Sequence, residues 1–274
     1  MSNYYGEPEF KCIADSHHLK FSGAMGFNSY PKVLEKIYFL SEKNNVKYII
    51  LDFSMIERII NCEMLPIIAA VIDYRENRKT NFKLILPKND YWKKLFLNTN
   101  YAHYIEPKSF DRTNLDSLSN FPATVFKGDD LRSQNVSDIM NIILQTITKI
   151  SRDSFRHLEW ALNEITDNVL VHSESQIGGL IQMNQFPKKK IFEFTVADFG
   201  VGIPRTLQRA YKFQSPEQAL ELAIKEGVTG DKTKGQGNGL FGTYELCARS
   251  NGAFKIHSGH GILLYASEKL RLKK

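Results

Sequence analysis

The sequence lacks a long hydrophobic run. Its longest uncharged apolar segment, residues 64–72, has about half of the roughly 20 residues that a membrane-spanning helix requires. The opening residues MSNYYGEPEFK contain no basic segment leading into an apolar one, as a secretory signal peptide would. We therefore expect neither a membrane protein nor a secreted one.

Cysteine is also scarce. The three cysteines are odd in number, lie far apart and form no C-x-x-C pair; they are Cys12, Cys62 and Cys247. This pattern disfavours both a disulfide framework and a zinc knuckle, and a reducing, cytoplasmic location fits it best. Internal repeats and low-complexity segments are missing from the sequence as well.

The sequence does have enough apolar material for a folded core, since 42% of its 274 residues are hydrophobic. This length suffices for one large domain or two ordinary ones. The formal net charge is +6, but the basic residues are scattered. Lys188–Lys190 follow Pro187 between two apolar runs, as in a hairpin tip, and other basic residues form a C-terminal tail. Solvated tips and tails explain the charge better than a nucleic-acid site, so nucleic acid is not an expected partner.

In the first half, strand and helix patterns alternate as they do in a small α/β layer. Residues 47–53 (KYIILDF) and 82–87 (FKLILP) are short apolar runs typical of buried strands. Residues 64–78 between them have a helical pattern, with Pro66 tolerated in the first turn, and residues 90–99 predict a second helix. A strand–helix–strand unit of this spacing implies that the two strands are parallel.

A polar stretch with two prolines, residues 107–122, separates this layer from the second half. The second half predicts a helix over 137–150, a stronger helix over 152–172, strands over 178–186 and 190–199, weak helical signals within 204–234, a helix over 244–250, and strands over 253–259 and 261–267. The stronger helix has one apolar stripe, formed by Leu158, Leu162, Ile165 and Val169. The second half therefore predicts an α/β domain of its own.

Two polar residues of the stronger helix carry the first chemical signal. Glu164 and Asn168 are four residues apart and so share one helix face, away from the apolar stripe. A carboxylate beside an amide oxygen suits a hydrated Mg²⁺ and an attacking hydroxyl or water. A solvated surface pair is the alternative interpretation of these two residues taken alone.

A second signal lies at the end of the strand over 190–199. Asp198 closes this strand and is followed by Gly200 and Gly202, which would let a ligand approach the backbone. A turn without a ligand explains the pattern equally well. The D-F-G string is also typical of protein kinases, but that fold requires a Gly-rich loop and a strand lysine upstream of the string and an H-R-D loop just before it. None of these precedes Asp198, so we reject this interpretation.

The third signal is the glycine-rich run GQGNGLFG. It contains a literal G-x-G-x-x-G, but GDKTKGQ stands where a Rossmann fold requires a buried strand. Gly235, Gly237 and Gly239 can present backbone N–H groups to phosphates just ahead of a helix, with Lys232 and Lys234 nearby. The run therefore indicates phosphate binding in general rather than a dinucleotide fold.

The order of the three signals is more specific than any one of them. An E-x-x-x-N helix, a strand ending in D-x-G-x-G, a polar lid over 204–234 and a G-x-G-x-G-L run entering a helix together resemble the ATP-binding domain of the GHKL superfamily. This superfamily includes gyrase, heat-shock chaperones, histidine kinases and MutL. The likeness covers roughly residues 123–268 and is greatest to histidine kinases and anti-sigma-factor serine kinases. It implies the Bergerat fold, a two-layer α/β sandwich.

The resemblance also implies a role for each residue. Asn168 would ligate the Mg²⁺ that bridges the phosphates of ATP, Asp198 would accept the amino group of adenine, and Glu164 would be the catalytic base. Gly200 and Gly202 would shape the adenine pocket. The other residues expected to bind the nucleotide are Lys232, Lys234, Gly235, Gly237, Gly239 and Leu240.

Residues 48–87 resemble a STAS domain, the fold of anti-sigma-factor antagonists, in their strand, loop and helix rhythm. Those antagonists carry a phosphorylatable serine in a D-S-S-G loop at the start of the helix, where this chain has Asn61, Cys62, Glu63 and Met64. The phosphoserine switch is therefore either lost or permanently mimicked by Glu63, whose carboxylate carries about half the charge of a phosphate. A plain α/β structural domain is the alternative.

The predicted fold class is α+β, with two domains. A STAS-like domain is expected over 1–110, a linker over 111–122, and a GHKL domain over 123–274 with its lid at 204–234. The expected ligands are ATP or ADP with Mg²⁺, and the expected partner is a STAS-type or other regulatory protein. The sequence leaves open whether the chain forms a homodimer.

Two functions follow from these expectations. The first is an enzyme that hydrolyses ATP or phosphorylates a serine or threonine of a partner in a partner-switching type of system. The second is a nucleotide-gated interaction module with negligible turnover, in which ATP orders the lid. Histidine autokinase activity is not expected, because no dimerisation helix with a phosphoacceptor motif occurs and His157 lies on the same helix as Glu164.

Overall fold

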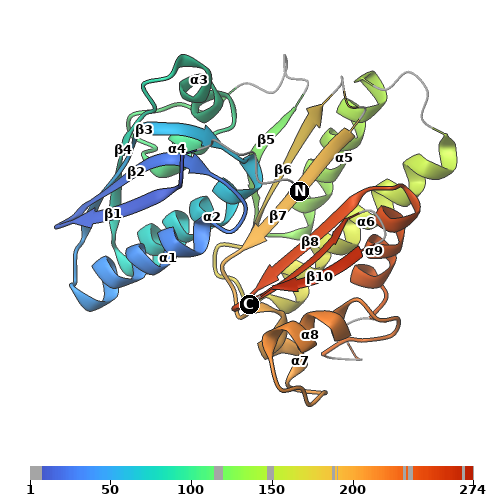
Figure 1. The fold of residues 1–274 in the computed structure, drawn as a ribbon. Coiled ribbons are helices and arrows are strands. Elements are labelled where there is room, and N and C mark those ends of the chain that lie inside the picture. The colour runs from blue at the N-terminus through green and yellow to red at the C-terminus, as the bar shows by residue number, and fades with distance from the viewer. Residues whose placement is uncertain are drawn as a thin grey trace. The chain divides into compact units, whose positions relative to one another are not determined.

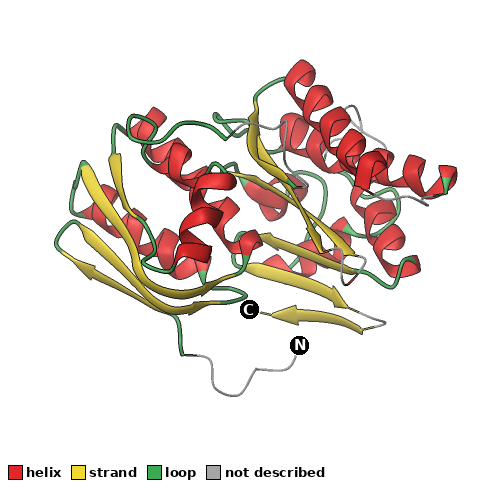
Figure 2. Cartoon of the chain, turned by 90° about the horizontal axis from the view of Figure 1, so that it is seen from above, coloured by secondary structure: helices red, strands yellow, loops and turns green. Residues whose placement is uncertain are grey.

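The structure is a computed structural model that describes residues 8–113, 120–146, 151–186, 189, 191–230, 233, 237–266 and 269–273. These residues form a mixed α/β fold of helices and three sheets (Figures 1 and 2). One compact unit comprises the described residues up to Val125 together with Leu180–Ala197; the other comprises Phe126–Gly179 and the described residues from Asp198 onward. Helices and several sheets agree with the predicted α+β class.

A four-stranded sheet with the order β1-β2-β3-β4 forms the centre of the first unit. Its strands are β1 (Lys11–Asp15), β2 (His18–Met25), β3 (Tyr48–Ile59) and β4 (Asn81–Ile85). β1 and β2 form an antiparallel hairpin, whereas β2, β3 and β4 run parallel. The parallel pairing predicted for the two apolar runs of the first half is therefore confirmed.

The helices of the first unit are α1 (Tyr30–Tyr38), the π-helical segment η1 (Phe39–Lys43), α2 (Asn61–Arg78), α3 (Asp90–Asn98) and α4 (Tyr101–Ile105). The sequence patterns did not indicate β1, β2, α1 or η1. Helix α2 begins at Asn61 rather than at Met64, so the prediction that Pro66 lies in the first turn is wrong. Strand β3 continues to Ile59 instead of ending at Phe53, because burial recurs at Ile56 and Ile59.

Aromatic side chains dominate the core of the first unit. The Phe53 ring lies 4.4 Å from that of Phe21 and 4.8 Å from that of Phe96, measured between ring centroids, and all three side chains are buried. Phe96 in turn meets Tyr101 edge to face. Each such side chain contributes about 1.5–3 kcal/mol through burial, so this cluster ties α3 and α4 to the sheet.

The first unit also contains most of a second sheet, in the order β5-β6-β7. Its strands are β5 (Phe121–Phe126), β6 (Gly179–Phe186) and β7 (Ile191–Asp198). The two strands predicted around the Lys-rich tip are confirmed as neighbours. The polar stretch 107–122 ends inside β5 rather than before it, and its residues 114–119 lie outside the described part. The domain boundaries expected at 111–122 stay a prediction, while the contacts group most of β6 and β7 with the first unit.

The second unit contains helices and a three-stranded antiparallel sheet with the order β10-β9-β8. The helices are α5 (Asp129–Thr146), α6 (Arg152–His172), α7 (Gly202–Leu207), α8 (Pro216–Ala223) and α9 (Gly239–Arg249). The strands are β8 (Ala253–Ser258), β9 (Gly261–Ala266) and β10 (Lys269–Lys273). The helix predicted over 152–172 is confirmed at both ends, and the two strands predicted after 253 are confirmed as a pair.

Two helices of this unit begin earlier than the sequence predicted. Helix α5 starts at Asp129 rather than at residue 137, and residues 147–150 of the expected helix lie outside the described part. Helix α9 starts at Gly239 rather than at Tyr244, so the last glycines of the glycine-rich run are helical residues. The expected lid, 204–234, includes α8 and most of α7.

An apolar cluster packs α8 and α9 onto β8 and β9. Its buried members are Leu220, Ile224, Phe254, Ile256, Leu263 and Tyr265. Partly buried side chains, including Leu240 and Tyr244 of α9, pack against them. This packing fixes the position of the first turn of α9, from which the candidate site is built.

Candidate functional site

The candidate site begins on α6, where the apolar stripe sets which face of the helix turns outward. Leu162 and Val169 of this stripe are buried, and its other two members are half-buried. Glu164 and Asn168 lie on another face of the helix and are half-buried. Both predicted residues are therefore placed beside a neighbouring element instead of in open solvent.

That neighbouring element is the start of α9 (Figure 1). A β-carbon built on Gly239 would lie 2.5 Å from Glu164 Oε2 and 3.4 Å from Asn168 Nδ2. Only glycine fits here without displacing the carboxylate. The structure thus brings together the E-x-x-x-N pattern and the glycine-rich run, which are far apart in the sequence.

Asn168 holds a buried polar atom that the described residues leave unsatisfied. Its Nδ2 has no hydrogen-bond partner among them, and such orphaned groups usually have a water, an ion or a ligand as partner. Which end of the amide carries the oxygen depends on that partner. The described residues contain no group of three or more His, Cys, Asp or Glu side chains that could cage a metal. Mg²⁺ needs no such cage, because it binds through one or two protein oxygens, phosphates and water, and an Asn–Glu pair fits that requirement.

The surroundings of Glu164 raise the pKa of its carboxyl group. Burial raises the pKa of the Glu164 carboxyl, the negative charge of Asp167 raises it further, and a hydrogen bond from Trp160 opposes both effects. A raised pKa brings a carboxylate closer to the range in which it accepts protons near neutral pH. The Glu164 carboxyl therefore binds a proton more readily than that of an ordinary glutamate.

Asp198 lies at the end of β7, where the sequence placed it. Its Oδ1 accepts a hydrogen bond from Gly200 N at 2.8 Å, and Val201 N donates to Ser173 O at 2.8 Å, just beyond α6. Burial raises the pKa of the Asp198 carboxyl, and the bond from Gly200 partly offsets this. The Asp198 carboxylate is thus held at the C-terminal end of the helix that carries Asn168.

The glycines that follow Asp198 are required by the chain itself. A β-carbon on Gly200 would collide with Ser173 O, and one on Gly202 would lie 2.8 Å from Ser258 Oγ. Gly202 also has a φ of +79°, a left-handed conformation that favours glycine. Ser258 Oγ accepts a hydrogen bond from Ile203 N at 2.8 Å. These contacts alone explain both glycines, so their presence is not separate evidence for an adenine pocket.

The remaining predicted residues are only partly placed. Lys232, Lys234 and Gly235 lie outside the described residues. Gly237 has a φ of +74°, and a β-carbon on it would lie 2.6 Å from the carbonyl of Val228. Leu240 is partly buried and packs against the apolar cluster that joins α9 to β8 and β9. The N-terminal turn of α9, whose first backbone N–H groups have no acceptor within the helix, lies next to Glu164 and Asn168.

Three residues of the site were missed by the sequence patterns. Trp160 lies one turn before Glu164, and its side chain contacts Gly242 of α9, where a β-carbon would collide with the indole ring. Ser173 and Ser258 fix the glycine turn after Asp198. Only Trp160 left a signal in the sequence, because it shares the four-residue spacing of Glu164 and Asn168.

The position compared with the phosphorylatable serine of the STAS-type antagonists holds Glu63, whose carboxylate is buried. Glu63 is fully buried in the first turn of α2, and its Oε2 accepts hydrogen bonds from Ser29 N at 2.8 Å and Tyr30 N at 3.2 Å. These N–H groups begin helix α1, whose dipole favours a negative charge there. Glu63 therefore joins two helices of the first unit and is not displayed on the surface.

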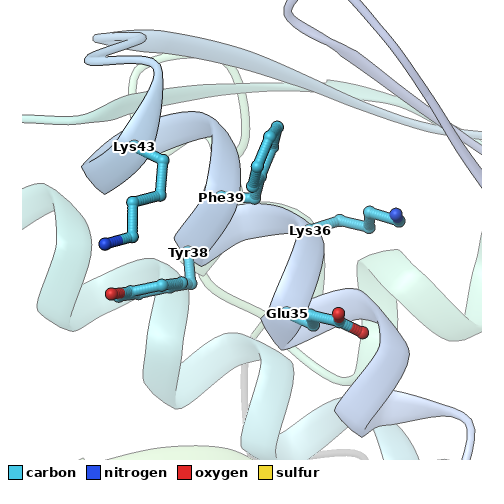
Figure 3. Close-up of a pocket in the computed structure, with 5 residues that line it drawn as sticks. All are labelled: Glu35, Lys36, Tyr38, Phe39 and Lys43. Carbon is cyan, nitrogen blue, oxygen red and sulfur yellow. The ribbon is translucent and has the colours of Figure 1, made fainter.

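A surface depression in the first unit has no comparable chemistry. It is lined by Glu35, Lys36, Tyr38, Phe39 and Lys43, from α1 and η1 (Figure 3). Lys43 Nζ lies 5.7 Å from the centroid of the Tyr38 ring, while Phe39 and Lys36 point elsewhere. The side chains do not converge on a common point, so we do not assign this depression a role.

Comparisons with protein-family models, curated proteins and solved structures gave no significant match. Among the helices of the described part, none has the length and apolarity needed to cross a bilayer.

Proposed function

We propose that the chain binds Mg-ATP between α6 and the first turn of α9 and either hydrolyses it or transfers its γ-phosphoryl group to a partner serine or threonine. The observation that supports this is the approach of Gly239 to Glu164 and Asn168. It combines a helix N-terminus, a carboxylate and a buried amide with an unsatisfied atom. This combination suits the phosphate end of a nucleotide, which is the role that the GHKL resemblance implies for these residues.

In this proposal each residue has one task. Asn168 would ligate Mg²⁺, whose charge would offset that of the phosphates. The N–H groups at the start of α9 would bind the phosphate oxygens. Asp198 would accept the amino group of adenine, and Glu164 would take the proton of the attacking water or hydroxyl. The raised pKa of Glu164 favours this last role.

The alternative is a nucleotide-gated interaction module with negligible turnover. The described part of the segment between Gly202 and Gly239 supports it, because two glycines of this segment pack closely against other residues of the same segment. Gly230 has no room for a β-carbon beside Thr206 O, and Gly237 has none beside Val228 O. A nucleotide at the start of α9 would therefore act directly on this segment, with or without chemistry.

The Glu164→Ala variant separates the two functions. Titration calorimetry with Mg-ADP should give affinities within a few-fold of the wild type, whereas turnover should fall by about 10² to 10⁴, the range for loss of a general base. Turnover is measured with γ-³²P-ATP, alone and with candidate partner proteins, as labelled protein or free phosphate. The matched control is Glu159→Ala, an exposed carboxylate on the same helix.

Full turnover in Glu164→Ala would remove Glu164 as the base. Nucleotide binding without turnover in the wild type, with its partner present, would leave the gated module. No nucleotide binding at all would reject both functions.

A further inference from the structure

Strand β1 lies at one edge of the four-stranded sheet in the first unit (Figure 1). It pairs with β2 as an antiparallel hairpin, and no strand of the described part pairs with its other edge. Four of its five residues are exposed, and Ile13 at its centre is 56% exposed. An open strand edge that carries an exposed β-branched side chain can pair with a further strand.

The hairpin fixes which backbone groups of β1 face the open edge. A turn of two residues joins β1 to β2, and Asp15 is paired with His18 across it. The residues that flank such a turn form a hydrogen-bonded pair, and hydrogen-bonded pairs then recur at every second position along the hairpin. The backbone groups of Asp15 and of every second residue before it therefore face β2. The N–H and C=O groups of Cys12 and Ala14 face the open edge instead.

The sequence of β1 is complementary to itself when two copies run antiparallel. With the two Ile13 residues opposite each other, Lys11 falls opposite Asp15 of the second copy, and Cys12 falls opposite Ala14. Each Cys12–Ala14 pair can exchange two backbone hydrogen bonds, because the outward-facing groups of both residues meet. The Lys11–Asp15 pairs bring opposite charges together on both sides of the central isoleucines, which stabilises the pairing of strands.

The same charges disfavour the competing arrangements. Parallel pairing in register would place Lys11 beside Lys11 and Asp15 beside Asp15, which is unfavourable. A shift of the antiparallel register by two residues, in either direction, would place Ile13 opposite a charged residue. Charged residues on an edge strand protect it from unrelated strands, and here they permit one register with a second copy. Within the chain, Asp15 pairs with Lys20 at 3.5 Å, but this exposed ion pair contributes little and does not hold Asp15 in place.

We propose that the chain forms a homodimer in which β1 pairs antiparallel with β1 of a second copy about Ile13, so that two four-stranded sheets become one continuous sheet. The twofold symmetry pairs the open β1 edge of each copy with that of the other, so the contact closes and does not grow into a fibre. A pairing of five residues per copy is small beside the roughly 1,200–2,000 Å² of stable interfaces, so we expect dissociation at about micromolar concentrations. The dimer does not depend on the proposed nucleotide site, which is built from α6 and α9.

Paired charge variants test the register. Sedimentation equilibrium of the full chain at about 1–300 µM should show a monomer–dimer equilibrium. Lys11→Asp gives the edge two acidic residues and Asp15→Lys gives it two basic ones, so each variant alone should dimerise at least about tenfold more weakly. An equimolar mixture of the two variants should recover dimerisation, because every pair across the contact then joins opposite charges. The control is Lys83→Asp, an exposed position on β4 at the other edge of the sheet, which should dimerise like the wild type.

A disulfide cross-link tests the central pair. Residues that face each other in a non-hydrogen-bonded pair have Cα atoms about 4.5 Å apart, which a disulfide can span. Ile13→Cys should therefore form a covalent dimer rapidly when it is oxidised with copper phenanthroline in air, whereas Lys83→Cys should cross-link at least about tenfold more slowly. Both variants retain Cys12, Cys62 and Cys247, so the comparison controls for the native thiols.

The outcomes separate this inference from the proposed function. A wild type that stays monomeric at about 300 µM would overturn the dimer, as would an Ile13→Cys variant that cross-links no faster than Lys83→Cys. A wild-type dimer that both charge variants leave intact would show that the contact lies elsewhere, and weakened dimerisation that mixing does not restore would overturn the antiparallel register. If a charge variant does not fold, the cross-linking comparison decides. Normal Mg-ADP binding by a monomeric wild type would overturn the dimer alone, whereas a dimer that binds no nucleotide would overturn the proposed function alone.

Discussion

Gly239, the first residue of α9, faces Glu164 of α6 so closely that a β-carbon on Gly239 would lie 2.5 Å from the Glu164 carboxylate. This contact joins the glycine-rich run, which contains Gly239, to the helical carboxylate–amide pair, which contains Glu164. Because the contact leaves no space for an added methyl group, it can be tested directly.

Gly239→Ala should disrupt this contact. The added methyl group must displace Glu164 or shift α9, so we expect nucleotide affinity to fall at least about tenfold and the free energy of unfolding to fall by about 1–3 kcal/mol. Calorimetry and urea unfolding measure the two effects. Gly128→Ala is the control, because a β-carbon there would meet nothing within 4 Å. Equal behaviour of the two variants would show that the close approach is irrelevant to binding.

Asn168→Ala should separate binding from stability. The variant removes a buried amide nitrogen that has no partner among the described residues, so the free energy of unfolding without nucleotide should change little. Mg-dependent nucleotide affinity should fall at least about tenfold, because the proposed Mg²⁺ ligand is lost. Asn163→Ala is the control on the same helix, since its amide is already paired with Arg132 and with the backbone of Glu159. If Asn168→Ala binds Mg-ADP as tightly as Asn163→Ala does, Asn168 is not a ligand.

Asp198→Asn should weaken adenine-nucleotide binding at least about tenfold, because the carboxylate that would accept the amino group of adenine becomes an amide that can point a donor at it. The bond from Gly200 N can persist to the amide oxygen, so the turn itself should survive. Calorimetry with Mg-ADP measures the loss. Unchanged affinity would remove Asp198 from the site.

The same variant should change how stability depends on pH. The pKa of Asp198 is raised by burial, so the folded chain binds its proton more tightly than the unfolded chain does. The wild type should therefore lose stability as the pH rises from the usual range of an aspartate, about 3.9, through the raised pKa. Asp198→Asn lacks this loss and should be more stable than the wild type at pH 7, but not below that range. Urea unfolding at several pH values tests this, and parallel curves for the two proteins would contradict it.

Glu63→Ala should destabilise the first unit. It leaves the N–H groups of Ser29 and Tyr30 without their buried acceptor, and it opens a cavity, so the free energy of unfolding should fall by about 2–4 kcal/mol. Glu63→Gln keeps an acceptor and should cost less. The exposed Glu57→Ala is the control and should stay within about 0.5 kcal/mol of the wild type. A loss no greater than that of the control would mean that Glu63 does not hold α1 and α2 together.

The sequence determined what depends on near neighbours along the chain. The apolar stripe of α6 predicted this helix at both ends, and the four-residue spacing of Glu164 and Asn168 placed them on one face, because both features follow from the helical repeat. The short apolar runs of the first half likewise predicted parallel strands. Such patterns need only a few consecutive residues, so they can be recognised without knowing the path of the chain.

Only the tertiary structure decided which distant residues meet. No local period relates the residues that meet in three contacts: Gly239 with Glu164, Ser29 with the buried Glu63, and Gly242 of α9 with Trp160 of α6. The early starts of α2 and α9 have the same origin, since their first turns are held by packing that overrides the weak helix propensity of Asn61 and Gly239. The sequence specifies the chemical type of each side chain, but its burial and its contacts are determined only when the chain folds.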